Sequence, residues 1–481
     1  MPDASSRSKP CECVVMLWLA LHFHSLSLEV FSRGVAVPEP LAVVEKQGGR
    51  TWVVACNDAA EACGVHLGMA APAAQAMADG LIVRKRDPSA ELESLAGLAV
   101  WAGRFTPSVS LEPPDGLLLE ISTCLSLHRG LANLLKLARS GIGEMGYAAS
   151  MACAPTAHGA WLLAKAGIEK AVREHARLET ILAALPLALL DQPPAVLEGL
   201  ERVGALTLGD CLRLPRGGVA RRFGQSLLDE LDLALGRRPE ALAFFVPPAS
   251  FERSLELPAP VHDAEALQFA VRRLLPELEG FLMLRQAGVQ ELELVCRHER
   301  RNNTVIKLGF AKPTRDAARM QLLLRETLGR TRLKAAMHTL VLRAPLVLPL
   351  SASSADLFQK SREADGDLLL ERLRIRLGKD AVYGVETAAD HRPERAWRAA
   401  WGPKRAAEPN RHRPLWLLPK PLPCHDGRLK LTSGPERIES GWWDDGDVAR
   451  DYYVAEDRNG AQLWVYCDRV SGEWYVHGVF A

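Results

Sequence analysis

The sequence has almost no excess of charge of either sign, and this limits what the chain as a whole can bind. Lysine and arginine number 59 against 58 aspartates and glutamates, a formal net charge of +1. A general electrostatic attraction to nucleic acid is therefore excluded, and any contact with DNA must come from local basic clusters. Hydrophobic residues make up 48% of the chain, which excludes disorder as its main state because disordered chains lack apolar residues.

The ten cysteines also lack any C-x-x-C pair. Structural zinc sites and compact disulfide frameworks are identified by regular cysteine spacings, so the sequence predicts neither. We expect free, mostly buried thiols in a reducing cytoplasm.

An uninterrupted apolar run of membrane-spanning length is missing as well. The most apolar stretch covers residues 14–31, but His22, His24 and Glu29 interrupt it. A transmembrane helix needs ~20 predominantly apolar residues, and no A-x-A-like cleavage site follows closely. The stretch therefore predicts a buried strand that runs into a helix, in a cytoplasmic protein without a membrane partner.

The chain is long enough for several domains. Its 481 residues exceed the ~250–300 at which a single hydrophobic core stops growing. Strand and helix patterns predict an α+β multidomain protein. The predicted boundaries are 14–175 for a first α+β region, 176–240 for a helical region, 250–350 for a second α+β unit, 351–440 for a linker region and 441–481 for an aromatic tail.

Two segments have spacings that suit contacts with DNA phosphates. Residues 200–210 have the form helix, glycine turn, helix, with the turn formed by Val203, Gly204, Ala205 and Thr207. Backbone N–H groups of such a turn can hold a phosphate, but the same pattern also describes a simple packing corner. In the second segment a turn between two predicted strands carries basic side chains, which form either a solvated tip or a phosphate-contacting edge: Arg297, Arg300 and Arg301.

The final segment is rich in aromatic residues. Four of the six tyrosines and four of the eleven tryptophans lie between residues 441 and 481, and residues 461–480 alternate as a hairpin. An isolated hairpin is marginally stable. We therefore expect the hairpin to pack on another domain or to serve as a docking surface.

The order of these pieces resembles the Y-family of DNA polymerases, and more closely its ImuB branch of mutagenesis proteins. The resemblance implies a right-hand fold with a C-terminal extension. Three segments resemble palm motifs: residues 17–29, 105–121 and 151–165. The fingers (about 34–95) are matched by residues 40–44, 52–57 and 64–69. The Gly204 turn resembles the thumb, residues 250–350 resemble a little finger, and residues 438–454 resemble the ImuB tail.

The loss of metal-binding carboxylates is the main difference between this chain and the active members of this family. Nucleotidyl transfer uses two divalent cations held by carboxylates. The resemblance places the first-strand aspartate on Ala20, a nearby acidic position on His22, and the adjacent Asp-Glu pair on Asp115 and Gly116. One carboxylate of the essential three remains, and Asp115 is also explained as a turn residue. We expect no catalytic residues, no metal and no cofactor; magnesium would matter only for an active enzyme.

The side chains that hold the triphosphate are missing too. In active relatives a tyrosine and an arginine follow the position of Asn57, whereas this chain has Asp58 and Glu61. An acid in place of an arginine would repel a triphosphate. A rebuilt metal site from His22, Glu29 and Asp115 is disfavoured because neutral histidine suits softer metals than magnesium.

A short peptide in the predicted linker resembles the motif by which bacterial polymerases dock on the sliding clamp. It consists of Ser354, Ala355, Asp356, Leu357 and Phe358, with serine where the family prefers glutamine. A Leu-Phe pair can enter an apolar pocket of a partner. The alternative is the start of an amphipathic helix that packs both side chains inward.

The resemblance implies a non-catalytic adaptor in DNA-damage-induced translesion synthesis and mutagenesis. Such an adaptor would bind DNA and the sliding clamp, and would recruit an error-prone replicative-type polymerase subunit and a RecA-like accessory protein. The tail residues expected to bind these partners are Trp442, Trp443, Tyr452 and Tyr453. Two alternatives stay open: an active Y-family polymerase with atypical metal ligands, and a structural DNA-binding repair protein.

Overall fold

The computed structural model describes residues 16–33, 39–298, 302–350, 360–401, 413–414, 416–424 and 429–480. The chain divides into two compact units, one formed by residues 1–308 and 313–354 and the other by residues 309–312 and 355–481. Within the described residues, no helix is both long and apolar enough to cross a membrane.

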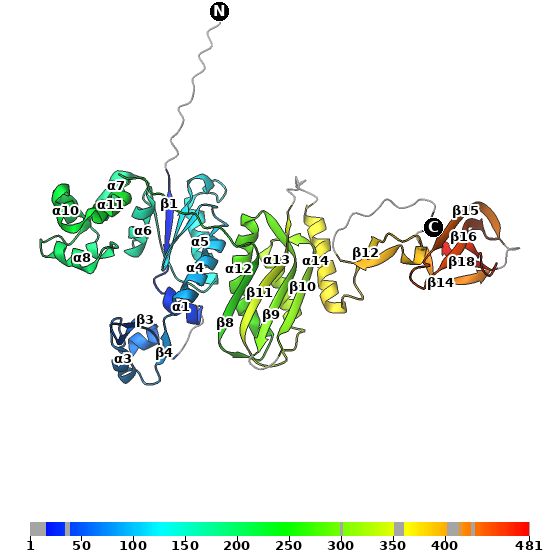
Figure 1. Cartoon of the computed structure of the whole chain (residues 1–481), viewed down its shortest axis with the longest axis horizontal. Coiled ribbons are helices and arrows are strands. Elements are labelled where there is room, and N and C mark those ends of the chain that lie inside the picture. The colour runs from blue at the N-terminus through cyan, green and yellow to red at the C-terminus, as the bar shows by residue number, and fades with distance from the viewer. Residues whose placement is uncertain are drawn as a thin grey trace, which may run out of the picture. The chain divides into compact units, whose positions relative to one another are not determined.

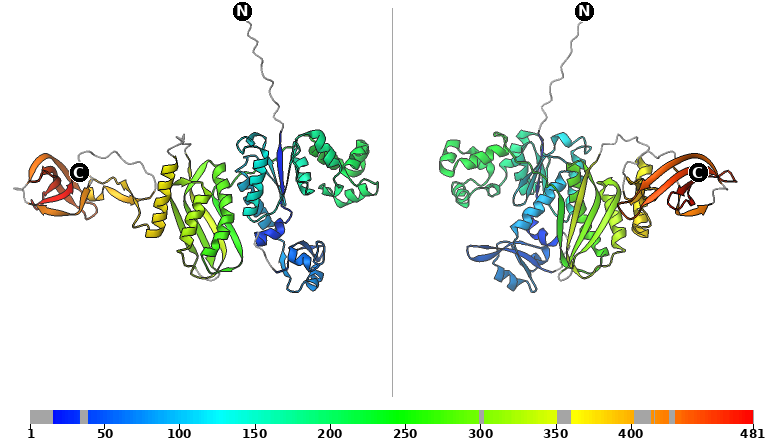
Figure 2. Two further views of the ribbon diagram at one scale, coloured as in Figure 1. Left: turned by 180° about the vertical axis from the view of Figure 1, so that it is seen from behind. Right: turned by 45° about the vertical axis from the view of Figure 1, so that its right-hand side comes forward.

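The first unit is built around an antiparallel sheet with the order β5-β6-β1-β7, called here the palm sheet. Its strands are β1 (Trp18–His22), β5 (Val109–Glu112), β6 (Gly116–Glu120) and β7 (Ser150–Ala154). Leu19 and Leu21 pack with α4 (Pro88–Ala102) and α5 (Leu131–Glu144), whereas Trp18 and Ala20 pack with α6 (Ala157–Lys165) on the other face (Figures 1 and 2). Because β1 is covered on both faces, its sequence is a continuous apolar run.

A small three-stranded sheet with the order β3-β2-β4 forms the fingers. Its elements are β2 (Leu41–Gln47), β3 (Arg50–Cys56), α2 (Asp58–Ala62), α3 (Ala71–Met77) and β4 (Ile82–Lys85). Helix α1 (Leu26–Ser32), which precedes them in the chain, buries Leu26 in the palm core. Strands β2 and β3 form a hairpin whose turn is Gly48-Gly49, with φ of +56° and +85°. Positive φ at both central residues suits the right-handed twist of a tight hairpin, and glycine adopts it without steric cost.

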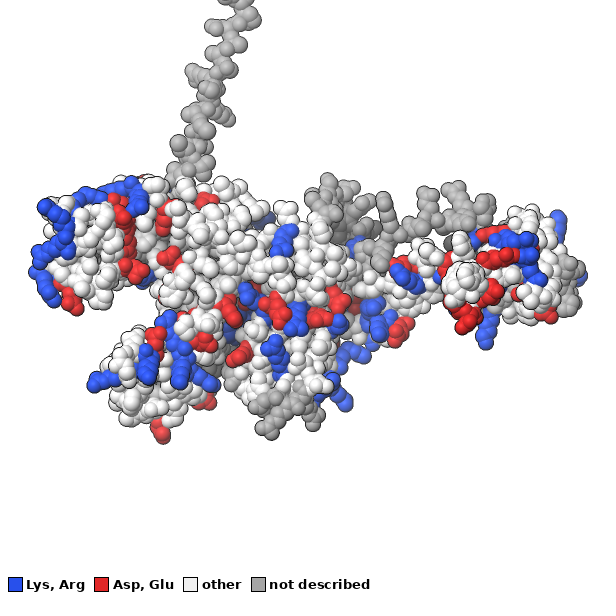
Figure 3. Space-filling model, viewed as in Figure 1, with Lys and Arg blue, Asp and Glu red and all other residues white. Residues whose placement is uncertain are grey.

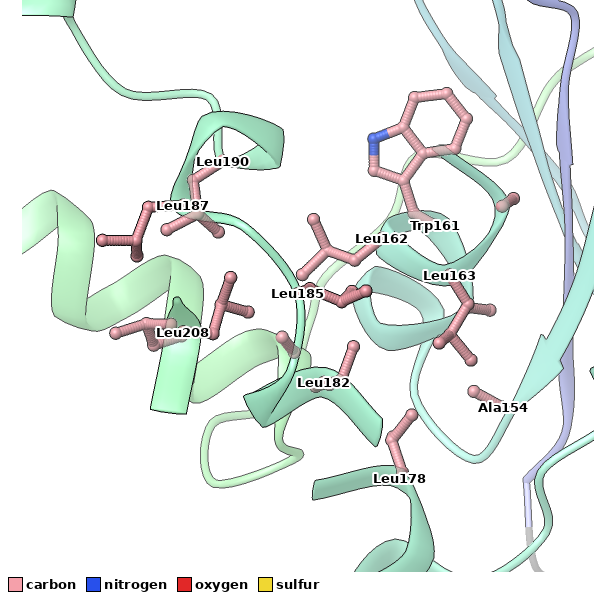
Figure 4. Close-up of a cluster of buried hydrophobic side chains, with 14 of the residues drawn as sticks. Ala154, Trp161, Leu162, Leu163, Leu178, Leu182, Leu185, Leu187, Leu190 and Leu208 are labelled. Atoms are coloured by element: carbon pink, nitrogen blue, oxygen red, sulfur yellow. The ribbon is translucent and has the colours of Figure 1, made fainter. Parts of the chain in front are cut away.

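The helical thumb continues the core of α6. Its helices are α7 (His175–Ala183), α8 (Pro194–Glu201), α9 (Leu208–Arg213), α10 (Arg216–Phe223) and α11 (Gln225–Ala234). Leu178 and Leu182 share one buried cluster with Leu162 and Leu163 of α6 (Figure 4). The thumb is therefore attached to the palm sheet through a common apolar core.

The last part of the first unit is the little finger, a four-stranded sheet with the order β10-β9-β11-β8. Its elements are β8 (Phe251–Val261), α12 (Gln268–Leu284), β9 (Ala287–His298), β10 (Thr304–Thr314), α13 (Ala317–Leu328) and β11 (Met337–Pro349). Helix α12 packs against β8, β9 and β11, and α13 packs against α12. The predicted α+β composition of this unit is confirmed.

The second unit begins with α14 (Lys360–Leu377) and a two-stranded ribbon, and ends in a five-stranded antiparallel sheet with the order β14-β18-β17-β16-β15, called here the tail sheet. The ribbon is β12 (Gly384–Thr387) and β13 (Trp397–Ala400); the tail strands are β14 (Trp416–Cys424), β15 (Lys430–Ser440), β16 (Val448–Glu456), β17 (Gln462–Asp468) and β18 (Trp474–Val479). Its core contains Ile438, Tyr452, Trp464 and Tyr466.

The tail sheet corrects one sequence-based boundary. A boundary at residue 441 cuts through it, because β14 and β15 belong to the region that we expected to be linker. These are the two edge strands, and most of their side chains are exposed or half-buried. Edge strands with few buried residues show no clear alternation of apolar and polar positions, which explains why the pattern was missed. The predicted hairpin is confirmed as β17 and β18.

Candidate functional site in the palm and the surfaces around it

The centre of the palm sheet holds the positions on which the family resemblance places metal ligands. Ala20 on β1 is fully buried and lies opposite Leu118 and Ala152 on its two neighbouring strands. His22 lies opposite Gly116 at the start of β6. Neither Ala20 nor Gly116 has a side chain that can coordinate a metal. Among the described residues, no group of three or more histidine, cysteine or acidic side chains could hold a metal ion.

The space above Gly116 is occupied by an aromatic ring. A Cβ atom built on Gly116 would overlap the six-membered ring of Trp161 and would lie 2.9 Å from the carbonyl oxygen of Glu112. Trp161 is buried on α6, and its ring meets His22 edge-on with the ring centroids 5.4 Å apart. A glutamate at position 116 could not enter this centre unless the indole moved.

The remaining carboxylate, Asp115, is engaged by a neighbouring histidine. Its Oδ2 atom lies 3.5 Å from Nε2 of His22, and its backbone carbonyl accepts a hydrogen bond from Phe23 N. Glu29, the third residue of the disfavoured metal site, accepts a hydrogen bond from Ala148 N instead. Burial raises the pKa of Glu29 to about 7. The structure therefore does not bring these three side chains together.

Acidic side chains follow Asn57 in the fingers, at the positions where the resemblance places triphosphate-binding residues. Asn57 caps helix α2 by accepting a hydrogen bond from Ala60 N, and Asp58 and Glu61 stand in the first turn of this helix. Lys165 on α6 donates from Nζ to the carbonyl oxygen of Leu189. Two of these groups are acidic and the lysine is engaged by a carbonyl oxygen, so together they give a triphosphate little electrostatic attraction.

In the thumb turn, each of the five backbone N–H groups from residue 203 to residue 207 already has a partner. Val203 and Ala205 donate to the carbonyl of Leu200, and Gly204 donates to that of Glu201. The N–H groups of Leu206 and Thr207 both donate to Oδ2 of the Asp210 carboxylate, at 3.1 and 2.9 Å.

Asp210 occupies the place that a phosphate would take in a phosphate-binding turn. Hydrogen bonds from Thr207 and Leu206 lower the pKa of this carboxyl to about 2, so it is charged at neutral pH. A fixed negative charge at the start of α9 stabilises the helix and repels a second anion. Of the two sequence-based alternatives for this turn, the structure favours the packing corner.

The thumb carries cations that the sequence reading overlooked. Arg221 and Arg222, in the last turn of α10, have no ion-pair partner among the described residues. Other thumb arginines are paired, for example Arg202 with Glu198 and Arg237 with Glu179. Lys and Arg side chains gather along the outer rim of the thumb on the face shown in Figure 3. The short basic run in residues 216–222 was the signal that could have revealed them.

The little-finger sheet has a mixed charge instead of a basic face. Arg297 is exposed on β9, whereas Arg300 and Arg301 lie outside the described residues. Lys307 forms ion pairs with Glu291 and Glu293. A surface that binds successive phosphates of a nucleic acid needs unpaired cations. Among the described residues of this sheet, Arg297 is the main candidate for such a contact. The clamp-like peptide, Ser354 to Phe358, also lies outside the described residues.

The four tail aromatics divide into two groups. Trp442 and Trp443 are 79% and 60% exposed, whereas Tyr452 is 1% exposed. Tyr452 stacks on Trp464 with the ring centroids 4.1 Å apart, and its hydroxyl lies 2.8 Å from Nδ1 of His477. Adjacent residues on a strand point to opposite faces, which explains why Tyr453 is half-buried near Trp474 while Tyr452 is in the core. The expectation that Tyr452 binds a partner is wrong.

Comparisons with known proteins identify relatives of this chain. The impB/mucB/samB family matches residues 35–165. The chain is 30% identical over 456 residues to Protein ImuB of Caulobacter vibrioides strain NA1000 / CB15N, an alignment that covers 87% of this chain and 100% of that protein. Protein ImuB of strain ATCC 19089 / CIP 103742 / CB 15 matches equally well.

Solved structures with a similar fold include DinB from Sulfolobus solfataricus (TM-score 0.38, 16% identity) and a post-insertion binary complex of Dbh DNA polymerase (TM-score 0.39, 16% identity). Each covers 70% of this chain and 100% of its own. The chain is 30% identical to the Caulobacter proteins over 87% of its length, and its palm and fingers match the impB/mucB/samB family. This chain therefore belongs to the ImuB branch of the Y-family DNA polymerases.

Proposed function

We propose that this protein is a non-catalytic adaptor in DNA-damage-induced translesion synthesis and mutagenesis. It binds DNA and the sliding clamp, and it brings an error-prone replicative-type polymerase subunit and a RecA-like accessory protein to the same place. The adaptor uses no metal and no cofactor of its own.

The observation that carries this proposal is the composition of the palm centre. Two of the three essential carboxylate positions are Ala20 and Gly116, and the indole of Trp161 covers the second. Two-metal catalysis requires both cations to be held in place by anionic oxygen ligands. With a single carboxylate, Asp115, and a histidine beside it, such a pair of cations has no adequate ligand set.

Primer extension tests the absence of catalysis. Purified full-length protein is incubated with primer-template DNA, deoxynucleotides and Mg²⁺ or Mn²⁺, with an active Y-family polymerase as the positive control. We expect no extension. Robust extension that is abolished by Asp115→Ala would establish the alternative, an active polymerase with atypical ligands, and would end the adaptor proposal.

We propose that DNA contact comes from the thumb rim, through Arg221 and Arg222. Arg221→Ala/Arg222→Ala is expected to weaken primer-template binding and to lower the slope of log affinity against log salt by about 2, because each phosphate contact contributes about 0.9. Fluorescence anisotropy at several salt concentrations measures both quantities. Arg202→Ala, which removes a paired thumb arginine, is the matched control. An unchanged slope in the double variant would remove these two residues from the interface.

We propose that the sliding clamp is bound by the peptide containing Leu357 and Phe358. Replacing both with alanine is expected to reduce clamp binding at least about 30-fold, as for a hot-spot pair. The control is Leu369→Ala/Leu370→Ala, which removes an exposed apolar pair from α14. Clamp affinity that survives the first double variant refutes the assignment. A protein that binds DNA but neither clamp nor partners would instead be the structural DNA-binding repair protein.

A further inference from the structure

The loop that joins β15 to β16, residues 441–447, presents two adjacent tryptophans to solvent. Trp442 and Trp443 are 79% and 60% exposed, and their rings meet edge-on with centroids 5.6 Å apart. Large neighbouring apolar side chains on a protein surface usually mark an interaction site, and tryptophan is enriched among the residues that dominate binding energy.

A buried arginine holds this loop in shape. Arg392 is 2% exposed and donates to both carboxylate oxygens of Asp444, at 2.8 Å each, and to the carbonyl of Gly446 at 3.2 Å. Its guanidinium also lies 5.9 Å from the centre of the Trp443 ring. Gly441 turns the chain into the loop with a φ of +95°, and a Cβ atom there would overlap the Gly446 carbonyl. A loop ordered in this way loses little conformational entropy when a partner binds.

The charge next to the tryptophans distinguishes between two kinds of partner. Asp445 and Asp447 are exposed and have no ion-pair partner among the described residues. Asp444, by contrast, is neutralised by Arg392 and Arg395. Free carboxylates beside the indoles repel the phosphates of nucleic acid and attract lysine and arginine side chains of a protein.

We propose that Trp442 and Trp443 insert into an apolar pocket on a protein partner, and that basic side chains around this pocket contact Asp445 and Asp447. This inference rests on the proposed function, which supplies the two proteins to be tested: the error-prone polymerase subunit and the RecA-like accessory protein. It narrows the partner surface from the whole aromatic tail to one preformed, acidic loop.

Calorimetric binding of the purified full-length chain to each of these two proteins from the same organism tests the inference. Trp442→Ala/Trp443→Ala is expected to weaken binding to at least one of them by at least about 30-fold. Asp445→Asn/Asp447→Asn is expected to weaken the same complex by about 2- to 10-fold and to flatten its salt dependence. Trp416→Ala removes a 70% exposed tryptophan from β14 and should leave binding unchanged.

The possible results distinguish a failure of this inference from a failure of the proposed function. If the wild-type chain binds a partner and the double tryptophan variant binds equally well, the inference is overturned and the adaptor function stands. An equal loss with Trp416→Ala also overturns it, because the effect is then not specific to the loop. A labelled oligo-dT that binds the wild type and not the tryptophan variant would make the loop a nucleic-acid surface. A wild-type chain that binds neither protein overturns the proposed function and the inference together.

Discussion

The palm centre and the tryptophan loop use aromatic side chains in opposite ways. In the palm, Trp161 is buried and fills the space above Gly116, where a metal-binding carboxylate would stand. In the tail, Trp442 and Trp443 are exposed, and hydrogen bonds from the buried Arg392 hold their loop in shape. An aromatic ring therefore fills space beside the palm sheet, whereas in the tail two aromatic rings face solvent on a loop held by polar contacts.

The largest expected difference between the two regions is in stability. Trp161→Ala should lower the free energy of unfolding of the first unit by about 3–5 kcal/mol, because a large buried ring is removed and leaves a cavity. Urea-induced unfolding followed by circular dichroism measures the change. A loss below about 1 kcal/mol would mean that the indole does not form part of the packed core, and the comparison would fail.

A second prediction concerns Glu29, beside the palm sheet. Burial raises its pKa from 4.5 to about 7, so the folded protein binds a proton that the unfolded chain releases above pH 4.5. The unfolding free energy should therefore fall as pH rises from about 4.5 to about 7, by up to about 3 kcal/mol, and then level off. Glu29→Gln should remove this contribution and stabilise the protein at pH 8. Identical pH profiles for wild type and variant would contradict it.

Replacing Gly116 with glutamate, which restores a carboxylate at this position, should destabilise the protein less than Trp161→Ala does and should not produce polymerase activity. Gly116→Glu forces a side chain against the Trp161 ring, and overpacking of this kind destabilises by about 1–3 kcal/mol. No primer extension is expected from this variant, since Ala20 supplies no ligand either. Gain of polymerase activity in Gly116→Glu alone would show that the indole yields easily and that the centre is less closed than its geometry indicates.

The smallest effect on stability is expected in the tail. Trp442→Ala and Trp443→Ala should each change the free energy of unfolding by less than about 0.5 kcal/mol, because exposed side chains contribute little to the core. Trp464→Ala, in the core of the tail sheet, should cost about 3–5 kcal/mol and is the matched contrast. Equal losses for Trp442 and Trp464 would show that the loop is packed in solution.

These contrasts also show how far sequence reasoning could go. The α+β character of the first region and of the little finger, the helical character of the thumb and the hairpin in the tail followed from apolar periodicity and turn residues, which are local signals. The absence of ligands at Ala20 and Gly116 followed from residue identity once the family resemblance aligned the positions. The limits of the tail sheet did not follow, because edge strands β14 and β15 bury few side chains.

The sequence, read with the family resemblance, determined that Ala20 and Gly116 stand where active members of the family carry metal-binding carboxylates, and that Asp58 and Glu61 follow Asn57. Only the tertiary structure decided that Trp161 covers Gly116 and that Tyr452 is buried while Trp442 is exposed. The physical reason is that burial and hydrogen-bond partners depend on which distant segments pack together. Packing of that kind is a property of the whole fold, and a single stretch of sequence carries no signal for it.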